Sequence, residues 1–158
     1  MTKKEPQEKF ERFTIEKELI DIPTVDFDDV LRSKQPIIFD TNFLFVTFEF
    51  RIDVIRQLTR LVANHYNLYI YEGTIDELKG IEMKKDKNKK YLPLIMKMLK
   101  LYNFKIVKSN IKHIDDQIIN DLNKQVIIAT NDKELRHRIW DEGGRCLYMR
   151  QKAYLEIK

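Results

Sequence analysis

Residues 35–46, QPIIFDTNFLFV, place the polar letters DTN inside an otherwise apolar stretch. The letters PIIF before them are apolar throughout, which is typical of a strand buried on both faces of a sheet. Asp40 follows directly, and FLFV then restores the apolar run. A carboxylate in such a place must be neutralised, hydrogen-bonded or bound to a cation, because burying an unpaired charge costs on the order of several kcal/mol. Asp40 is therefore the first candidate functional residue.

Length and composition indicate the class of protein. The chain has 158 residues, enough for one domain with a substantial core, and its 43% hydrophobic and 34% charged residues are ordinary for a globular protein. The start, MTKKEPQEKFERF, is too charged for a secretory signal, and no apolar run approaches the length of a membrane span. We therefore expect a cytoplasmic protein with no membrane association.

Metal-binding side chains other than acids are few. Cys146 is the only cysteine, which excludes an intramolecular disulfide and a cysteine-rich zinc cluster. The histidines at positions 65, 113 and 137 are not spaced as metal ligands. Any metal bound by this chain must therefore be held by oxygen atoms. The net charge of +4 permits a polyanionic partner without requiring one.

Short apolar runs rich in β-branched and aromatic residues predict strands, and segments with helical spacing of apolar residues separate them. The predicted strands are residues 36–40, 68–71, 104–108, 125–129 and 145–148. This alternation predicts an α/β fold, a three-layer α/β/α domain with a mostly parallel central sheet of about five strands. We assign that domain to residues 36–158. Residues 1–35 are interpreted as an N-terminal extension with a capped helix near residues 26–33.

In an open parallel sheet, ligands bind beyond the carboxyl ends of the strands. Here an acid follows each of the first four strands, in the order Asp40, Glu77, the pair Asp115 and Asp116, and Asp132. If the strands are neighbours, these acids meet at one edge of the sheet, where four like charges require cations. A metal site would explain all four at once. Because adjacent helical residues point about 100° apart, only one of the paired acids faces the cluster.

Helix capping is the alternative explanation for several of these acids. TIDE at 74–77 and NDKE at 131–134 both fit capping boxes, and acids favour the first turn of any helix. Taken singly, Glu77, Asp115 and Asp132 are well explained in this way. Asp40 is not, because it follows a fully apolar strand and precedes further apolar residues.

Together, the motifs resemble those of the PIN-domain ribonucleases over about residues 36–155. The resemblance rests on FDTNFLF after the first strand, EL after the second, DD-x-I at a helix start, and ATND-x-x-L followed by GG-x-x-x-YMR. DDQII, TNDKELRHRI and the basic YMRQK look most like the archaeal and eukaryotic branch that processes ribosomal RNA precursors, and less like the toxin branch. The resemblance implies a PIN-like α/β domain and a metal-dependent endoribonuclease specific for single strands.

By that resemblance, Asp40, Glu77, Asp115 and Asp132 bind the metal and carry catalysis. Asp115 is preferred to Asp116 because the family's third motif places an isoleucine three residues later, as Ile118 is here. Neighbouring polar side chains are expected to orient the carboxylates or metal-bound water, or else to make local turn and cap bonds. These supporting residues are Thr41, Asn42, Asp116, Thr130 and Asn131.

Oxygen ligands suit Mg²⁺ or Mn²⁺, as one ion or two. Two such ions can activate a water, align a phosphodiester and stabilise the leaving oxygen, which leaves a 5′-phosphate and a 3′-hydroxyl. Because the acids repel RNA unless metal is bound, basic residues elsewhere must bind it. Lys84 and Lys85, in a lysine-rich stretch that also fits a solvated face, are one candidate group. The other group, which we favour, consists of Arg136, Arg138, Arg145, Arg150 and Lys152.

Other functions stay open. A catalytically weak PIN-like factor for RNA binding or ribosome assembly, and a toxin-type ribonuclease, would share this fold. An aspartyl-phosphate phosphatase would need a second acid at position 42, and a receiver domain would need paired acids after the first strand; the sequence has neither. The expected partners are RNA, above all a ribosomal RNA precursor, and ribosome-assembly proteins. The oligomeric state, a homodimer included, is left open.

Overall fold

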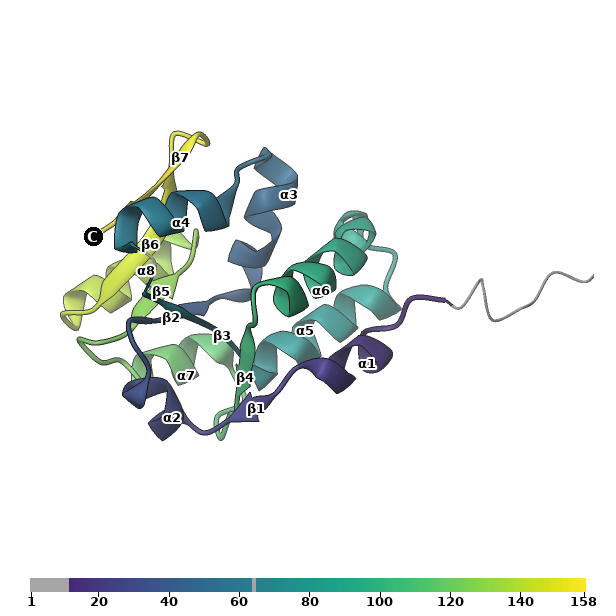
Figure 1. The fold of residues 1–158 in the computed structure, drawn as a ribbon, viewed down its shortest axis with the longest axis horizontal. Helices are drawn as coiled ribbons and strands as arrows, with labels where there is room; N and C mark the ends of the chain where they lie inside the picture. The colour runs from purple at the N-terminus through teal and green to yellow at the C-terminus, as the bar shows by residue number, and fades with distance from the viewer. Residues whose placement is uncertain (1–11, 64) are drawn as a thin grey trace, which may run out of the picture.

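A twisted, mostly parallel sheet runs through the middle of the molecule (Figure 1). The computed structural model describes residues 12–63 and 65–158, and within them the strand order is β1-β4-β3-β2-β5-β6-β7. Every neighbouring pair is parallel except β6 and β7. The strands are β1 (Thr24–Val25), β2 (Pro36–Phe39), β3 (Asn67–Tyr71), β4 (Lys105–Val107), β5 (Ile127–Ala129), β6 (Arg145–Arg150) and β7 (Tyr154–Ile157).

The predicted α/β class and mostly parallel sheet are confirmed, but the sheet is larger than expected. The five predicted strands correspond to β2 to β6, whereas β1 and β7 at its two edges were missed. β1 has only two residues, too few for an alternating pattern. β7 lies four residues after β6 and pairs with it as a hairpin, so it adds no new helix-separated unit.

Helices cover both faces of the sheet, which gives three layers. The helices are α1 (Ile15–Glu18), α2 (Phe27–Arg32), α3 (Val46–Phe50), α4 (Val54–Val62), α5 (Glu72–Met83), α6 (Leu92–Leu101), α7 (Ile114–Asn120) and α8 (Lys133–Asp141), with the 3-10 turns η2 (Leu19–Asp21), η3 (Thr41–Phe45) and η4 (Lys87–Tyr91). One core packs α1 and α3 to α6 on one face, and a second packs α2, α7 and α8 on the other. No helix in the described ranges is long and apolar enough to span a bilayer.

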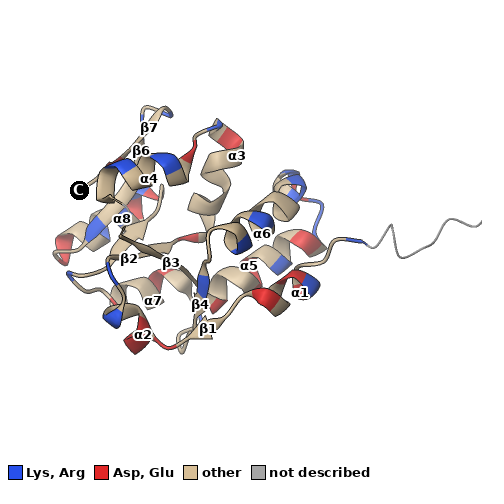
Figure 2. Cartoon of the chain, viewed as in Figure 1, with Lys and Arg blue, Asp and Glu red and all other residues tan. Residues whose placement is uncertain are grey.

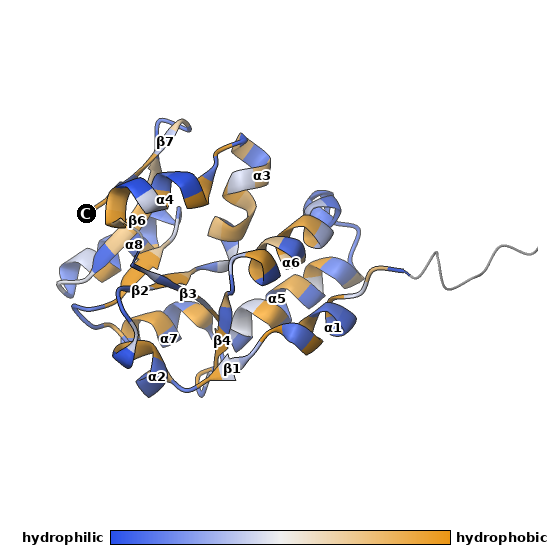
Figure 3. Cartoon of the chain, viewed as in Figure 1, coloured by the Kyte–Doolittle hydropathy of each residue, from blue (hydrophilic) through white to orange (hydrophobic). Residues whose placement is uncertain are grey.

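Alternate residues of β2 supply both cores. Ile37 and Phe39 belong to the first, whereas Ile38 belongs to the second, because successive side chains of a strand point to opposite faces. Phe39 makes edge-to-face contacts with Phe43 and Phe104, at ring-centroid separations of 5.1 Å each. The covering helices carry separate apolar and polar stripes, most sharply in α4 (Figure 3). The apolar strand before Asp40 is thus fully enclosed.

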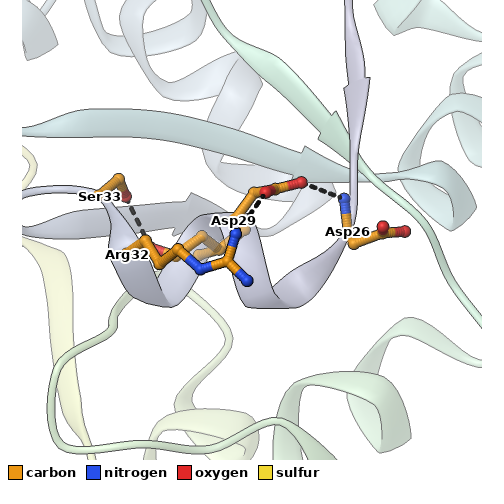
Figure 4. Close-up of polar contacts among 5 residues, drawn as sticks. Asp26, Asp29, Arg32 and Ser33 are labelled. Carbon is orange, nitrogen blue, oxygen red and sulfur yellow. Dashed lines mark hydrogen bonds and ion pairs between the residues drawn. The ribbon is translucent and has the colours of Figure 1, made fainter.

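The N-terminal segment packs against this same domain. β1 pairs with β4, and Ile15 and Ile22 join the first core while Val30 joins the second. The predicted capped helix is α2, where Asp29 accepts a hydrogen bond from the Asp26 backbone N–H at 3.1 Å (Figure 4). The described part of residues 1–35 therefore shares the core of the rest of the chain. A boundary at residue 35 stays a prediction.

Candidate active site

The four predicted acids line one pocket of about 580 Å³. Asp40 follows β2, Glu77 lies in α5 after β3, Asp115 lies in α7 after β4, and Asp132 follows β5. Because those strands are parallel neighbours, their carboxyl ends lie at the same edge of the sheet. Strand order therefore brings together residues that are up to 92 positions apart in the sequence.

Asp40 lies at the floor of this pocket. Asp40 is 7% exposed. Its carboxylate accepts hydrogen bonds from the Thr41 backbone N–H at 2.9 Å and from Thr130 Oγ1 at 2.8 Å. Burial raises the pKa of Asp40 to about 6, and the charges of Asp115 and Glu77 raise it further against the lowering effect of the two hydrogen bonds. The protein therefore holds this carboxylate where its charged form is disfavoured.

Asp115 and Asp116 have different surroundings, as expected for adjacent helical residues. Asp115 is half-buried and lines the pocket together with Asp40 and Asp132. Burial, and then the neighbouring charge of Asp132, raises its pKa. Asp116 is exposed, lies 3.7 Å from Arg138 Nη2 and lines only an adjoining hollow. Of the pair, Asp115 is the one placed to meet the other acids.

Asp132 both caps a helix and lines the pocket. It is the N-cap of α8, and its Oδ1 accepts from the Leu135 backbone N–H at 3.1 Å. The capping box read from NDKE was therefore wrong about its first residue, because Asp132 and not Asn131 is the cap. Its own backbone N–H donates to Thr130 Oγ1 at 3.1 Å, so Thr130 links Asp132 to Asp40.

The capping box read from TIDE was also wrong. α5 begins at Glu72, so Thr74 and Glu77 both lie inside the helix. Thr74 is fully buried, and its hydroxyl accepts a hydrogen bond from Thr41 Oγ1 at 3.0 Å. Glu77 is one turn further on, exposed and facing the pocket. Helix capping thus no longer explains Glu77.

Asn42 and Asn131 connect the ends of three strands. The Asn131 backbone N–H donates to Asn42 Oδ1 at 3.3 Å, and the Met149 backbone N–H donates to Asn131 Oδ1 at 3.0 Å. These bonds join the segments after β2 and β5 to β6. Both asparagine side chains line the pocket.

The donor atoms around the pocket fit a hard divalent cation, because carboxylate oxygens are the ligands that Mg²⁺ and Mn²⁺ prefer. The raised pKa of Asp40 also fits, since a cation would offset the repulsion from Asp115 and Glu77. As placed, however, no three His, Cys, Asp or Glu side chains in the described part of the chain are close enough to share one ion. Binding a metal would require the carboxylates to draw together.

The arginine-rich group that we favoured for RNA binding does not form one surface. Arg138 does lie beside the acids, because it is 3.7 Å from Asp116 and lines the adjoining hollow together with Glu77 and Asp115. Arg145 starts β6, at the edge opposite the pocket, and donates to Gln35 Oε1 at 3.1 Å. Arg136 lies over the ring of Tyr148, 4.8 Å from its centroid, and Arg150 pairs with Glu156 at 3.1 Å. Lys152 lies in the exposed turn after β6.

The lysine-rich stretch, the other predicted RNA-binding group, reaches the pocket through Asn88. Lys84 and Lys85 are exposed just after α5, and η4 follows them. Asn88 of η4 lines the pocket itself. The turn between α5 and α6 carries visible positive charge (Figure 2). Asn88 therefore brings one end of this stretch to the pocket wall.

Sequence reasoning missed part of the pocket wall. Glu49 and Phe50 of α3, Met149 of β6 and Asn88 of η4 all line it. Met149 follows the predicted strand 145–148 directly but is not an acid, and the other three follow no predicted strand, so a search for acids at strand ends could not identify them. The nearest signal is the DTNFLF motif, since α3 begins at the next residue.

The fold and the acidic edge place this chain in a known class. The family model described as a PIN like domain matches residues 37–152, and the chain belongs to that family.

A relative from the archaeon Methanocaldococcus jannaschii, Ribonuclease VapC4, is 32% identical over 124 residues, which cover 77% of this chain and 95% of the relative. Among solved structures, the PIN domain endonuclease Utp24 superimposes with a TM-score of 0.64 at 22% identity, over 78% of this chain and 90% of that one. This second likeness supports the fold alone.

Proposed function

We propose that this protein is a divalent-metal-dependent endoribonuclease that hydrolyses single-stranded RNA. The observation that carries the proposal is the pocket in which buried Asp40 is surrounded by Glu77, Asp115 and Asp132 at the carboxyl edge of the sheet. Membership of the PIN-like family and the similarity to Ribonuclease VapC4 support RNA as the substrate. The motif resemblance described above supports a ribosomal RNA precursor as the particular RNA.

In this proposal, Asp40, Glu77, Asp115 and Asp132 hold one or two Mg²⁺ or Mn²⁺ ions. Bound there, the ions would supply an activated water, an aligned phosphodiester and a stabilised leaving oxygen. Thr130 and the Thr41 backbone N–H fix the orientation of the Asp40 carboxylate, and Thr74 ties the Thr41 side chain to α5. Lys84 and Lys85 bind RNA phosphates beside the pocket.

The test is cleavage of a 5′-labelled single-stranded RNA with Mn²⁺, with Mg²⁺ and with a chelator. We expect cleavage only with metal, products that end in a 5′-phosphate and a 3′-hydroxyl, and a loss of at least about a hundredfold in Asp40→Asn. Cyclic-phosphate products, or equal rates in wild type and Asp40→Asn, would contradict the proposal. Faster cleavage of a ribosomal precursor fragment than of an unrelated strand would support the narrower substrate.

A second candidate is an RNA-binding factor without catalysis. The observation in its favour is that no three of the described metal-binding side chains are grouped closely enough to share an ion as placed. On this alternative, the protein binds the same RNA in the presence of metal and leaves it intact. The cleavage assay separates the two candidates directly.

A further inference from the structure

The pocket that holds the acids has an unusual shortage of positive charge. Its wall includes the five carboxylates Asp40, Glu49, Glu77, Asp115 and Asp132. Among the described residues that line it, none is Lys, Arg or His. A phosphodiester that enters this pocket therefore finds no cationic side chain there. Arg138 lies in the adjoining hollow beside Asp115 and Asp116, so within the pocket itself the phosphate oxygens are left to metal ions and neutral donors.

Side-chain amides are the neutral N–H donors on that wall, and two of them are fixed in orientation. Asn42 Oδ1 accepts from the Asn131 backbone N–H, and Asn131 Oδ1 accepts from the Met149 backbone N–H. A backbone N–H can only donate, so the amide oxygen, and not the nitrogen, must face it in each case. The planar amide then directs its NH₂ group the other way.

Both NH₂ groups remain available for a ligand. No hydrogen bond in the described part of the chain uses either of them, although both side chains line the pocket. Both asparagines are also close in sequence to proposed metal ligands. Asn42 is two residues after Asp40, and Asn131 directly precedes Asp132. The donors are therefore held beside the acids by the contacts that join β2, β5 and β6.

We propose that Asn42 and Asn131 are substrate-positioning residues whose NH₂ groups bind a non-bridging phosphate oxygen of the RNA. This inference rests on the proposed function, and it assigns these asparagines to substrate rather than to the carboxylates. A neutral donor suits the position because a lysine or arginine there would pair with the surrounding acids, whereas an amide donates without neutralising them.

Replacing either asparagine by aspartate removes its NH₂ donor and keeps its Oδ1 acceptor. Asn131→Asp keeps Oδ1 for the Met149 backbone N–H and loses the NH₂ group, but it also adds a charge. Glu49→Gln removes one charge from the same wall without touching the asparagines, so Asn131→Asp/Glu49→Gln keeps the total charge of the pocket. Asn42→Asp/Glu49→Gln is the parallel variant, and Glu49→Gln alone is the matched control.

Binding of a fluorescent single-stranded RNA decamer is measured in Ca²⁺, with a gel to confirm that the RNA stays intact. The charge-balanced double variants are expected to bind at least about tenfold more weakly than Glu49→Gln. Their melting temperatures, and the rise in melting temperature with Mn²⁺, are expected to persist, because the acids are untouched. In Mn²⁺, cleavage by the double variants should show a raised KM with a smaller change in kcat.

Equal RNA binding by Glu49→Gln and both double variants would overturn the inference and leave the proposed function standing. Loss of the Mn²⁺-dependent rise in both double variants would also overturn it, since the asparagines would then act on the metal site. If wild type itself fails to bind RNA in Ca²⁺ and to cleave it in Mn²⁺, the proposed function fails and the inference fails with it.

Discussion

Asp40 loses nearly all contact with solvent on folding, and two hydrogen bonds replace only part of that solvation. Its pKa of about 6 lies above the ordinary value of 3.8. Between those values the folded protein binds a proton that the unfolded chain has already released. Stability contributed by this group is therefore fully present below pH 3.8 and is lost as pH rises through about 6.

We predict that the free energy of unfolding of the metal-free protein has a component that falls by about 3 kcal/mol at most between pH 4 and 7. Asp40→Asn should lack this component and be the more stable protein at pH 7. Denaturant unfolding at a series of pH values, in chelator, measures both curves. Parallel curves for the two proteins would show that Asp40 does not titrate in this range.

The affinity of the protein for metal should also depend on the ionisation of Asp40, but it should rise with pH where stability falls. A cation binds the ionised carboxylate, so affinity should rise with pH through about 6 and then level off. Thr130→Val removes the hydroxyl that lowers the pKa of Asp40, so it should move this midpoint to higher pH. Calorimetric titration with Mn²⁺ measures both midpoints. An unchanged midpoint in Thr130→Val would mean that this hydrogen bond does not control the ionisation.

At the scale of helices and strands, the acids could be predicted from their positions after the strands, but their local roles could not. TIDE and NDKE fit capping boxes by letter, yet α5 begins two residues before Thr74 and α8 is capped by Asp132. Helix boundaries are defined only to within one or two residues, so a capping box that matches by letter can miss the residue that begins the helix. Here the Thr74 hydroxyl accepts a hydrogen bond from Thr41, a residue 33 positions earlier, so no local pattern contains this contact.

Asp132 allows its capping role and its proposed metal role to be separated. Asp132→Asn keeps an oxygen for the Leu135 backbone N–H, so stability should change by less than about 0.5 kcal/mol, whereas the Mn²⁺-dependent rise in melting temperature should shrink. Asp132→Ala should also lose the Mn²⁺-dependent rise in melting temperature, and it should lower the free energy of unfolding by about 1 kcal/mol. Melting with and without Mn²⁺ measures these effects. An undiminished rise in Asp132→Asn would remove Asp132 from the metal site.

At the scale of the whole molecule, the sequence was enough to predict the layered fold and the convergence of four acids. Both follow from strands that are apolar throughout and from acids placed after them. The features that the sequence could not predict depend on contacts between residues that are far apart in the chain. β1 is defined by its pairing with β4, and the position of Asn88 beside the acids depends on how η4 returns after α5. The arginine-rich group failed as one surface because β6 carries Arg145 and Arg150 to opposite ends.

Substitutions in the N-terminal segment test whether the domain begins before residue 36. Ile15 is 0% exposed and Ile20 is 82% exposed, although both lie in the same short segment. Ile15→Ala should therefore cost about 2 to 5 kcal/mol of unfolding free energy, and Ile20→Ala about 0.5 kcal/mol or less. Chemical denaturation measures the difference. Equal small effects would support the predicted boundary, with the domain beginning at residue 36.

We propose that Asp40, Glu77, Asp115 and Asp132 together form one divalent-metal site. The most direct measurement is the anomalous scattering of Mn²⁺ in a crystal of the protein grown with that ion. We expect a peak within about 2 to 2.5 Å of carboxylate oxygens from Asp40 and at least one other of the four acids, with the acids drawn together around it. A well-ordered pocket without a Mn²⁺ peak, at a concentration that supports cleavage, would contradict it.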